Sequence, residues 1–335
     1  MPSPESKRTY VRVNPDLPVL RRELERVDFG SDARPGLPPS LVDAIEADGG
    51  LWYAGDYYTD AASVVARARE VKAVALRLDF RDLSLLEELP NVRYLHLRSD
   101  GRPPLGPVAG LTKLRALILG VSALRGELDL AAFPQLRWLR ASLGGKGGTA
   151  LRESLNDGHP RLEHLSLTEV RDRTLDELVH GFRRLRHLRI HFADHLRTVG
   201  DLGPVARTLR GLDLDFTGLR SLDGIGALQK LEMFRIHGGK VTDLQPLGAL
   251  PSLRYAELDT GPGIASLEPL RGHPQLRMLA LGLMQDGDLS PLASMPELVA
   301  VGRGPRLAGE PPFPDLAVLP RDHPFRTEFR RAVYG

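Results

Sequence analysis

Residues 209–231 contain the spacing that most constrains how this chain can fold. From Leu209 to Leu228 the leucine and isoleucine residues stand at intervals of 3, 2, 5, 3, 3 and 3 residues. These intervals fit neither a single helix nor a single strand. They fit a short strand followed by a turn and a loose helical return. We therefore predict that the segment forms one coil of a solenoid.

The same spacing recurs from residue 71 to residue 303. The steps between successive coils are 21 to 26 residues long, and most are close to 22. One coil cannot bury its apolar side alone, so neighbouring coils must stack. The first start is the least distinct, because Ala73 followed by Leu76 and Leu78 fits almost as well as Val71. The predicted coils begin at Val71, Val92, Leu114, Leu136, Leu162, Leu185, Leu209, Leu231, Leu253, Leu276 and Leu298.

Four segments express the repeat most clearly: LRALIL at 114–119, LEHLSL at 162–167, LRGLDL at 209–214 and LRMLAL at 276–281. This pattern resembles the leucine-rich repeat family, and its steps resemble the short bacterial internalin-like class. The resemblance implies an α/β solenoid, a horseshoe of about eleven coils with a parallel β-sheet on its concave face. That class places asparagine where the chain leaves each strand. Here those positions hold Ser122, Thr217, Gly239 and Gly261, so we expect a less regular ladder of side-chain hydrogen bonds.

The segments outside the repeat are predicted to close its ends. Residues 1–50 form an N-terminal helical cap, with helical spacing at 16–28 and a short helix after Ser40. Residues 51–70 form a first degenerate coil or a capping strand, residues 71–304 the repeat array, and residues 305–335 a C-terminal cap with one last strand. A solenoid needs caps because its end coils would otherwise expose apolar surface.

Composition narrows the class of partner. The formal net charge is only +2, and arginine, which greatly outnumbers lysine, is spread around the coils. This distribution argues against nucleic acid as a partner. The polar N-terminus lacks the apolar core of a signal peptide, and no apolar run is long enough to cross a membrane. The chain has no cysteine, so we expect a cytoplasmic protein without disulfides, and the Arg-rich, Lys-poor usage indicates a bacterial source.

The strand register predicts which side chains face the concave side. Alternate residues of a strand point to opposite faces, so three rows of side chains should cross the sheet. One row is rich in aromatic residues and methionine, the second in charged residues, and the third in His and Asp. The side chains that we predict to contact a partner are Tyr94, Trp138, Arg140, His164, His187, Arg189, His191, Asp213, Asp215, Met233, Arg235, His237, Tyr255, Glu257 and Asp259.

Two of these rows alternate in charge over four successive coils. One row holds Arg189, Asp213, Arg235 and Glu257, and the row beside it holds His191, Asp215, His237 and Asp259. A parallel sheet tolerates such alternation, whereas like charges about 4.8 Å apart would repel each other. The order predicts a cross-strand ion-pair ladder, and it also suits a surface that binds a protein or peptide. The two interpretations are compatible.

The same cluster leaves a catalytic alternative open. An enzyme acting on a small molecule could use the His/Asp/Arg cluster of the coils starting at 185–253, with His191, Asp215, His237 and Asp259 as catalytic residues. A metal site is disfavoured, because the side chains point outward in separate rows and the arginines repel a cation.

The glycine-rich segment at 142–149 does not match a phosphate-binding loop. The pattern GxxxxGK followed by Ser or Thr is absent, and the segment lies in the longest coil, so we expect a flexible inserted turn. We therefore expect no cofactor. We favour non-enzymatic binding of a protein or peptide through the concave face, as a scaffold, a regulator or an immunity-type protein.

Overall fold

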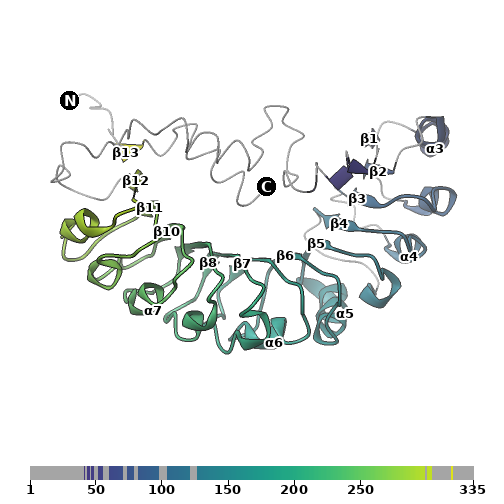
Figure 1. Cartoon of the computed structure of the whole chain (residues 1–335). Coiled ribbons are helices and arrows are strands. Elements are labelled where there is room, and N and C mark those ends of the chain that lie inside the picture. The colour runs from purple at the N-terminus through teal and green to yellow at the C-terminus, as the bar shows by residue number, and fades with distance from the viewer. Residues whose placement is uncertain are drawn as a thin grey trace, which may run out of the picture.

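A computed structural model describes residues 41, 44–45, 47–48, 52–55, 60–70, 74–78, 82–97, 104–120, 127–298, 300–303 and 318–319. These residues form one sheet of 13 parallel strands, which lie side by side in chain order. Figure 1 shows the strands along the inner side of an arc and the helical segments along its outer side. The predicted solenoid with a parallel sheet on its concave face is therefore confirmed.

The strands are short, as expected for coils of about 22 residues. Strands β7 and β8 are the longest, with seven residues each. The strands are β1 Trp52–Gly55, β2 Ala75–Leu78, β3 Tyr94–Leu97, β4 Ala116–Leu119, β5 Trp138–Ser142, β6 His164–Thr168, β7 His187–Ala193, β8 Gly211–Thr217, β9 Met233–Gly238, β10 Tyr255–Asp259, β11 Met278–Leu281, β12 Ala300–Arg303 and β13 Val318–Leu319.

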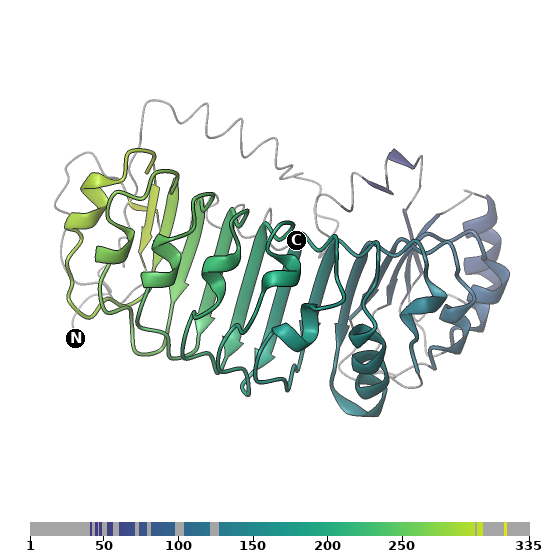
Figure 2. The same ribbon diagram turned by 60° about the horizontal axis from the view of Figure 1, so that its bottom comes forward.

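Most return segments are single helical turns that lie across the outer face of the sheet (Figure 2). The α-helices are α3 Ala61–Glu70, α4 Gly106–Ala109, α5 Gly145–Asn156, α6 Asp176–Val179 and α7 Gln245–Gly248. The 3₁₀-helices are η1 Ser84–Glu88, η2 Leu130–Ala132, η3 Gly203–Val205, η4 Ile225–Ala227, η5 Glu268–Leu270 and η6 Ser290–Ser294. None of the described helices is both long and apolar enough to span a lipid bilayer.

Leucine side chains from successive coils form one continuous core. In the coil at 209–231, the predicted inward side chains are at most 1% exposed. Burying a leucine of this kind contributes roughly 1.5–3 kcal/mol. The same cluster of buried side chains extends from residue 64 to residue 301. Each coil therefore depends on its neighbours, and the sheet is held as a firm platform for its outward side chains.

The strand pairing confirms the predicted rows of side chains. Trp138 of β5 pairs with His164 of β6, as the rows require. Ala75 of β2 pairs with Tyr94 of β3, which sets the start of that coil at Ala73, two residues later than the start chosen from the sequence. The shift is even, so the same side chains still face inward.

The described residues between 41 and 48 lie against the concave side of the first coils. The described residues 41, 44, 45 and 47 are helical, as predicted for the segment after Ser40. Leu41 and Ile45 are fully buried and pack with Tyr94 and Trp138. This part of the predicted N-terminal cap therefore covers side chains of the concave sheet itself.

The glycine-rich segment at 142–149 is not the flexible turn that we expected. Helix α5 begins at Gly145 and includes the rest of the segment. Gly148 packs so closely that a Cβ atom there would lie 2.1 Å from the Leu143 carbonyl oxygen. Tertiary packing has overridden the weak helix propensity of glycine. The predicted helix at 16–28 lies outside the described residues, as does the predicted C-terminal cap apart from β13.

Buried histidines link neighbouring coils. The Nε2–H group of His159 donates to the Phe133 carbonyl, and that of His273 donates to the Leu250 carbonyl, each over 3.0 Å. Thr217 stands at an expected asparagine position, but its buried hydroxyl has no hydrogen-bond partner among the described residues. The side-chain ladder is therefore irregular at this position, as the missing asparagine predicts.

Candidate functional site

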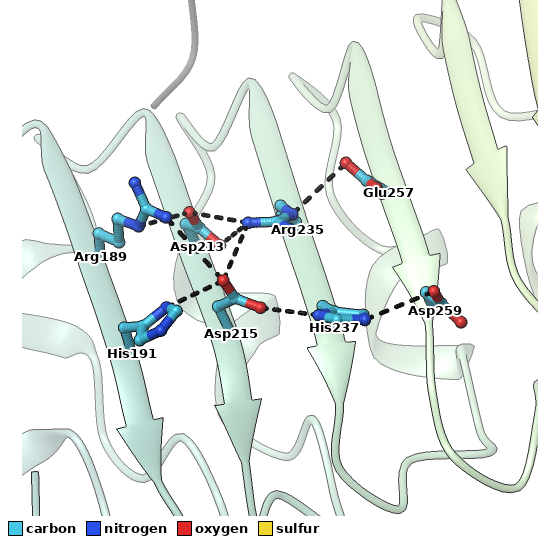
Figure 3. A network of polar contacts seen from close by, with 8 residues as sticks. All are labelled: Arg189, His191, Asp213, Asp215, Arg235, His237, Glu257 and Asp259. Atoms are coloured by element: carbon cyan, nitrogen blue, oxygen red, sulfur yellow. Dashed lines mark hydrogen bonds and ion pairs between the residues drawn. The ribbon is translucent and has the colours of Figure 1, made fainter. Parts of the chain in front are cut away.

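Strands β7 to β10 carry a continuous ion-pair network on the concave face (Figure 3). Nη1 of Arg235 is 3.3 Å from Oδ1 of Asp213 and 3.5 Å from Oδ2 of Asp215. Its Nε is 3.4 Å from Oε2 of Glu257. Nε of Arg189 approaches Asp213 from the other side, 3.2 Å from Oδ2. The predicted alternation of charge therefore forms an ion-pair ladder across four strands.

Asp215 joins this row to the row of His and Asp. Its Oδ1 is 2.8 Å from Nδ1 of His237, and its Oδ2 is 2.9 Å from Nδ1 of His191. Nε2 of His237 is in turn 3.7 Å from Asp259. The side chain of Asp215 is 6% exposed and that of Asp259 is 40% exposed. The network is thus buried at Asp215 on β8 and reaches solvent at Asp259 on β10.

Burial and neighbouring charges set the ionisation of these groups. Burial raises the pKa of Asp213 to about 6, and Arg235 and Arg189 oppose this only in part. Burial also acts to raise the pKa of Asp215, but Arg235 and the hydrogen bond from His237 outweigh it and hold this pKa below its usual value. Both carboxyl groups are therefore ionised at pH 7.

Strands β5 to β7 carry a column of stacked rings. The ring centroids of Trp138 and His164 are 5.4 Å apart with an interplanar angle of 16°, and those of His164 and His187 are 4.6 Å apart at 8°. Gly211 leaves room for the last ring, since a Cβ atom there would lie 2.6 Å from Nδ1 of His187. Burial lowers the pKa of His164 to about 3 and that of His187 to about 4. Both rings are therefore neutral at pH 7.

Arg140, in the charged row on β5, has no acidic partner among the described residues. Its neighbour in the row is Ser166 on β6, and the next residue is Arg189 on β7. The side chain is half-buried. Burial, together with the positive charge of Arg189, holds the pKa of Arg140 below its usual value. One end of the row therefore carries an uncompensated positive charge.

Phe192 and Phe216 are the large hydrophobic side chains that are exposed in the described part of the chain, by 54% and 45%. Their rings stack with centroids 5.4 Å apart. The ring of Phe192 contacts that of His191, and the ring of Phe216 contacts that of His237. The pair therefore borders the ion-pair ladder.

The backbone holds these two phenylalanines away from the core. Their φ angles are 54° and 50°, in the left-handed region that costs a non-glycine residue roughly 1–2 kcal/mol. Strict alternation along each strand would turn both side chains inward, so the sequence did not predict their exposure. The following residues, Ala193 and Thr217, are the buried ones. Phenylalanine itself gives no signal of a positive φ, so the residue types at these strand ends do not indicate the irregularity.

The structure divides the predicted contact residues into two groups. Tyr94 is 1% exposed and Trp138 is 8% exposed, and both belong to the buried cluster that includes Leu41 and Ile45. These two side chains therefore contact their own chain, and their role in binding a partner stays a prediction. The charged and histidine residues predicted on β7 to β10 come together in the ladder. Met233 and Tyr255 are partly exposed beside them.

The His and Asp side chains form a shared network and not a separate centre. The described residues contain no group of three or more His, Asp or Glu side chains that could hold a metal ion. Asp215 is shared between His191, His237 and Arg235, so its charge is already compensated. No contact favours the catalytic alternative over the ion-pair ladder.

Comparison with known proteins identifies the fold. No protein-family model and no curated protein matches the chain. A solved internalin structure from Listeria monocytogenes overlaps with a TM-score of 0.50 at 18% identity, over 73% of this chain and 72% of the internalin. A leucine-rich repeat protein of Leptospira interrogans gives a TM-score of 0.49 at 14% identity, over 85% of this chain and 80% of that protein. The overlap with the internalin, together with the parallel sheet and the leucine core of the coils, shows that the chain has the leucine-rich repeat fold.

Proposed function

We propose that this protein binds another protein or a peptide through its concave face, around Phe192 and Phe216. The observation that supports the proposal best is the exposure of this stacked pair beside the ion-pair ladder. Exposed aromatic side chains next to polar groups are typical of interaction sites. The left-handed backbone keeps both rings outward, and Glu169 shares this conformation at the corresponding position after β6.

The platform itself favours binding. A sheet that is already ordered by one continuous core loses little conformational entropy when a partner docks. Protein is proposed over nucleic acid because the arginines of the ladder are paired with carboxylates. In the part of the chain that the structure describes, this pairing interrupts the basic strip that a phosphate backbone would need.

The class of leucine-rich repeat, the bacterial source and the cellular location are part of the same proposal. Steps close to 22 residues support the short internalin-like class, and the Arg-rich composition supports a bacterial source. We retain the cytoplasm as the proposed location, which fractionation of the native host with a specific antibody would test. Scaffold, regulator and immunity-type protein differ in the partner they bind, so identifying the partner decides among these roles.

Affinity capture from the native host tests the proposal. The double variant Phe192→Gly/Phe216→Gly removes both rings and relieves the left-handed backbone. We expect it to lose the captured partner by about tenfold or more, with an unchanged or higher melting temperature. Glu169→Gly is the control for the capture assay, because Glu169 has a φ of 58° at the corresponding position after β6 and carries no ring. It also loses the hydrogen bond from the Ser142 hydroxyl, so its melting temperature is not part of the comparison. If the double variant captured the partner as well as this control, the aromatic pair would not be the binding site.

A further inference from the structure

We infer that the concave face binds a side-chain carboxylate of its protein partner between Arg140 and Arg189, above Ser166. The inference rests on the proposed function, because it names the chemical group that a bound protein segment presents at this point of the face.

The strand register places these three residues in one row. Arg140 pairs with Ser166, and Ser166 pairs with Arg189, on β5, β6 and β7. Neighbouring strands lie about 4.8 Å apart, so the backbones of β5 and β7 are separated by roughly 10 Å. Two arginine side chains can both reach a group that sits between them above the small serine. The hydroxyl of Ser166 offers a further donor at the same place.

The charges of the row explain why the group is an anion. Beyond Arg189 the row continues with alternating signs through Asp213, Arg235 and Glu257, and each neighbouring pair is in contact. Ser166 stands where this alternation would require an acid. Arg140 is half-buried and has no acidic partner among the described residues. A partly desolvated cation without a counter-charge is unfavourable, and a carboxylate from the partner would remove that cost.

The magnitude of the missing charge favours a carboxylate over a phosphate. Arg189 already contacts Asp213 and Asp215, with Nε and Nη2 at 3.2 and 3.9 Å. Asp215 belongs to the neighbouring row, where it also contacts His191 and His237. Within the charged row itself, three arginines stand beside two acids, Asp213 and Glu257, so about one negative charge is missing. A carboxylate supplies one, whereas a phosphate monoester carries nearly two. The adjoining column of His164 and His187 adds no positive charge, because burial lowers their pKa values to about 3 and about 4.

The chain already holds one carboxylate in this manner. Asp48, in the segment that covers the first coils, lies 2.6 Å from Nη1 of Arg115 and 3.3 Å from Nη1 of Arg93. The Tyr94 hydroxyl donates to it over 2.6 Å. Two arginines from successive coils and one hydroxyl thus bind one carboxylate on the concave side. Arg140 and Arg189 come from coils two apart and from a different row, but together with Ser166 they offer the same kinds of group, two guanidinium groups and one hydroxyl.

Selection of peptides from a random linear library displayed on phage tests the inference with the full chain as bait. We expect the selected sequences to share an aspartate or glutamate. A synthetic peptide of that consensus should bind Arg140→Gln about tenfold or more weakly than the wild type, as should its amide analogue (Asp→Asn or Glu→Gln) with the wild type. Arg254→Gln removes the same charge from an exposed position and should bind normally. Circular dichroism should show that Arg140→Gln melts at the wild-type temperature or above it.

Each other outcome overturns the inference in a distinguishable way. Selected peptides that bind without an acidic residue, or that bind Arg140→Gln unchanged, would remove the carboxylate site and leave protein binding intact. A tenfold preference for a phosphoserine analogue over the acidic peptide would reassign the site to a phosphorylated partner. If no peptide were selected, the carboxylate site would be rejected, and the capture experiment with the phenylalanine variants would decide separately on protein binding.

Discussion

The two halves of the charged row on the concave face both contain arginine, but only one half places acidic residues beside it. On β7 to β10, each arginine contacts at least one carboxylate of its own sheet. On β5, Arg140 faces Ser166 and then another arginine. The first half uses its charges to hold adjacent coils together, whereas the second leaves one charge uncompensated. In a solenoid, the residue on the next strand therefore decides whether a charge serves the fold or a partner.

Removing the central guanidinium of the ladder should have the largest effect. Arg235→Ala leaves Asp213, Asp215 and Glu257 buried without their shared cation. We expect the free energy of unfolding to fall by about 4 kcal/mol, the usual loss when one partner of a buried pair is removed. Urea denaturation measures it. Arg210→Ala breaks the exposed pair with Glu232 and should cost no more than about 0.5 kcal/mol. Equal losses for both variants would contradict a structural role for the ladder.

Acid should act on the two regions with opposite signs. The pKa of His187 is about 4 in the folded protein, against about 6.5 in an unfolded chain. The unfolded chain therefore binds the proton first, and stability is lost as the pH falls below 6.5, by about 3 kcal/mol from this residue at pH 4. His164 contributes in the same direction. Asp213, with a raised pKa of about 6, takes up its proton first in the folded state. Its ionised carboxylate therefore destabilises the folded protein above pH 6, and acid removes this destabilisation.

Stability measured from pH 7 to pH 4 separates these contributions. The variant His164→Phe/His187→Phe should lose less stability on acidification than the wild type, because its rings do not titrate. Asp213→Asn should lose more stability than the wild type, because it lacks the stabilising protonation of Asp213 in acid. The comparison between the two regions would fail if both variants followed the wild-type pH profile.

A smaller effect of opposite sign is expected from the two arginines that border Ser166. Arg140→Met should raise the free energy of unfolding by about 1 kcal/mol, since it replaces an unpaired, half-buried cation with an apolar side chain of similar length. Arg189→Met should lower it, because Asp213 loses a partner. Thermal and urea unfolding of both variants would measure the difference. Destabilisation by Arg140→Met would show that this arginine has a structural partner.

The smallest change in stability is expected at the exposed aromatic pair. Phe192→Gly relieves a left-handed backbone and also loses ring stacking, and these contributions are each about 1 kcal/mol with opposite sign. We expect the melting temperature to remain nearly unchanged while partner capture falls. A large loss of stability would assign Phe192 to the fold.

Sequence periodicity was sufficient to predict the solenoid, the strand register and the alternating ladder. Leucine spacing determines which side chains point inward, and once the register is known, Arg189, Asp213 and Arg235 must lie side by side. The missing acid beside Arg140 was also visible, as Ser166 in the same row.

Two features of the face depend on geometry that the residue types do not reveal. Phe192 and Phe216 point outward because the residue at this position has a positive φ in successive coils, at Glu169 as well. Tyr94 and Trp138 are buried in one cluster with Leu41 and Ile45, which lie far from them in sequence and follow no repeat. The helix at Gly145 depends on close backbone packing, which overrides propensity.

The segment at 41–48 also sets the size of what can dock. Among the described residues, the partly exposed side chains of the concave face extend from Arg140 on β5 to β10, five strand intervals or about 24 Å. An extended chain spans this distance with about seven residues. The surface on which a partner can dock is therefore shorter than the number of coils indicates. A partner segment that crosses the strands can contact this surface over the length of one short linear motif.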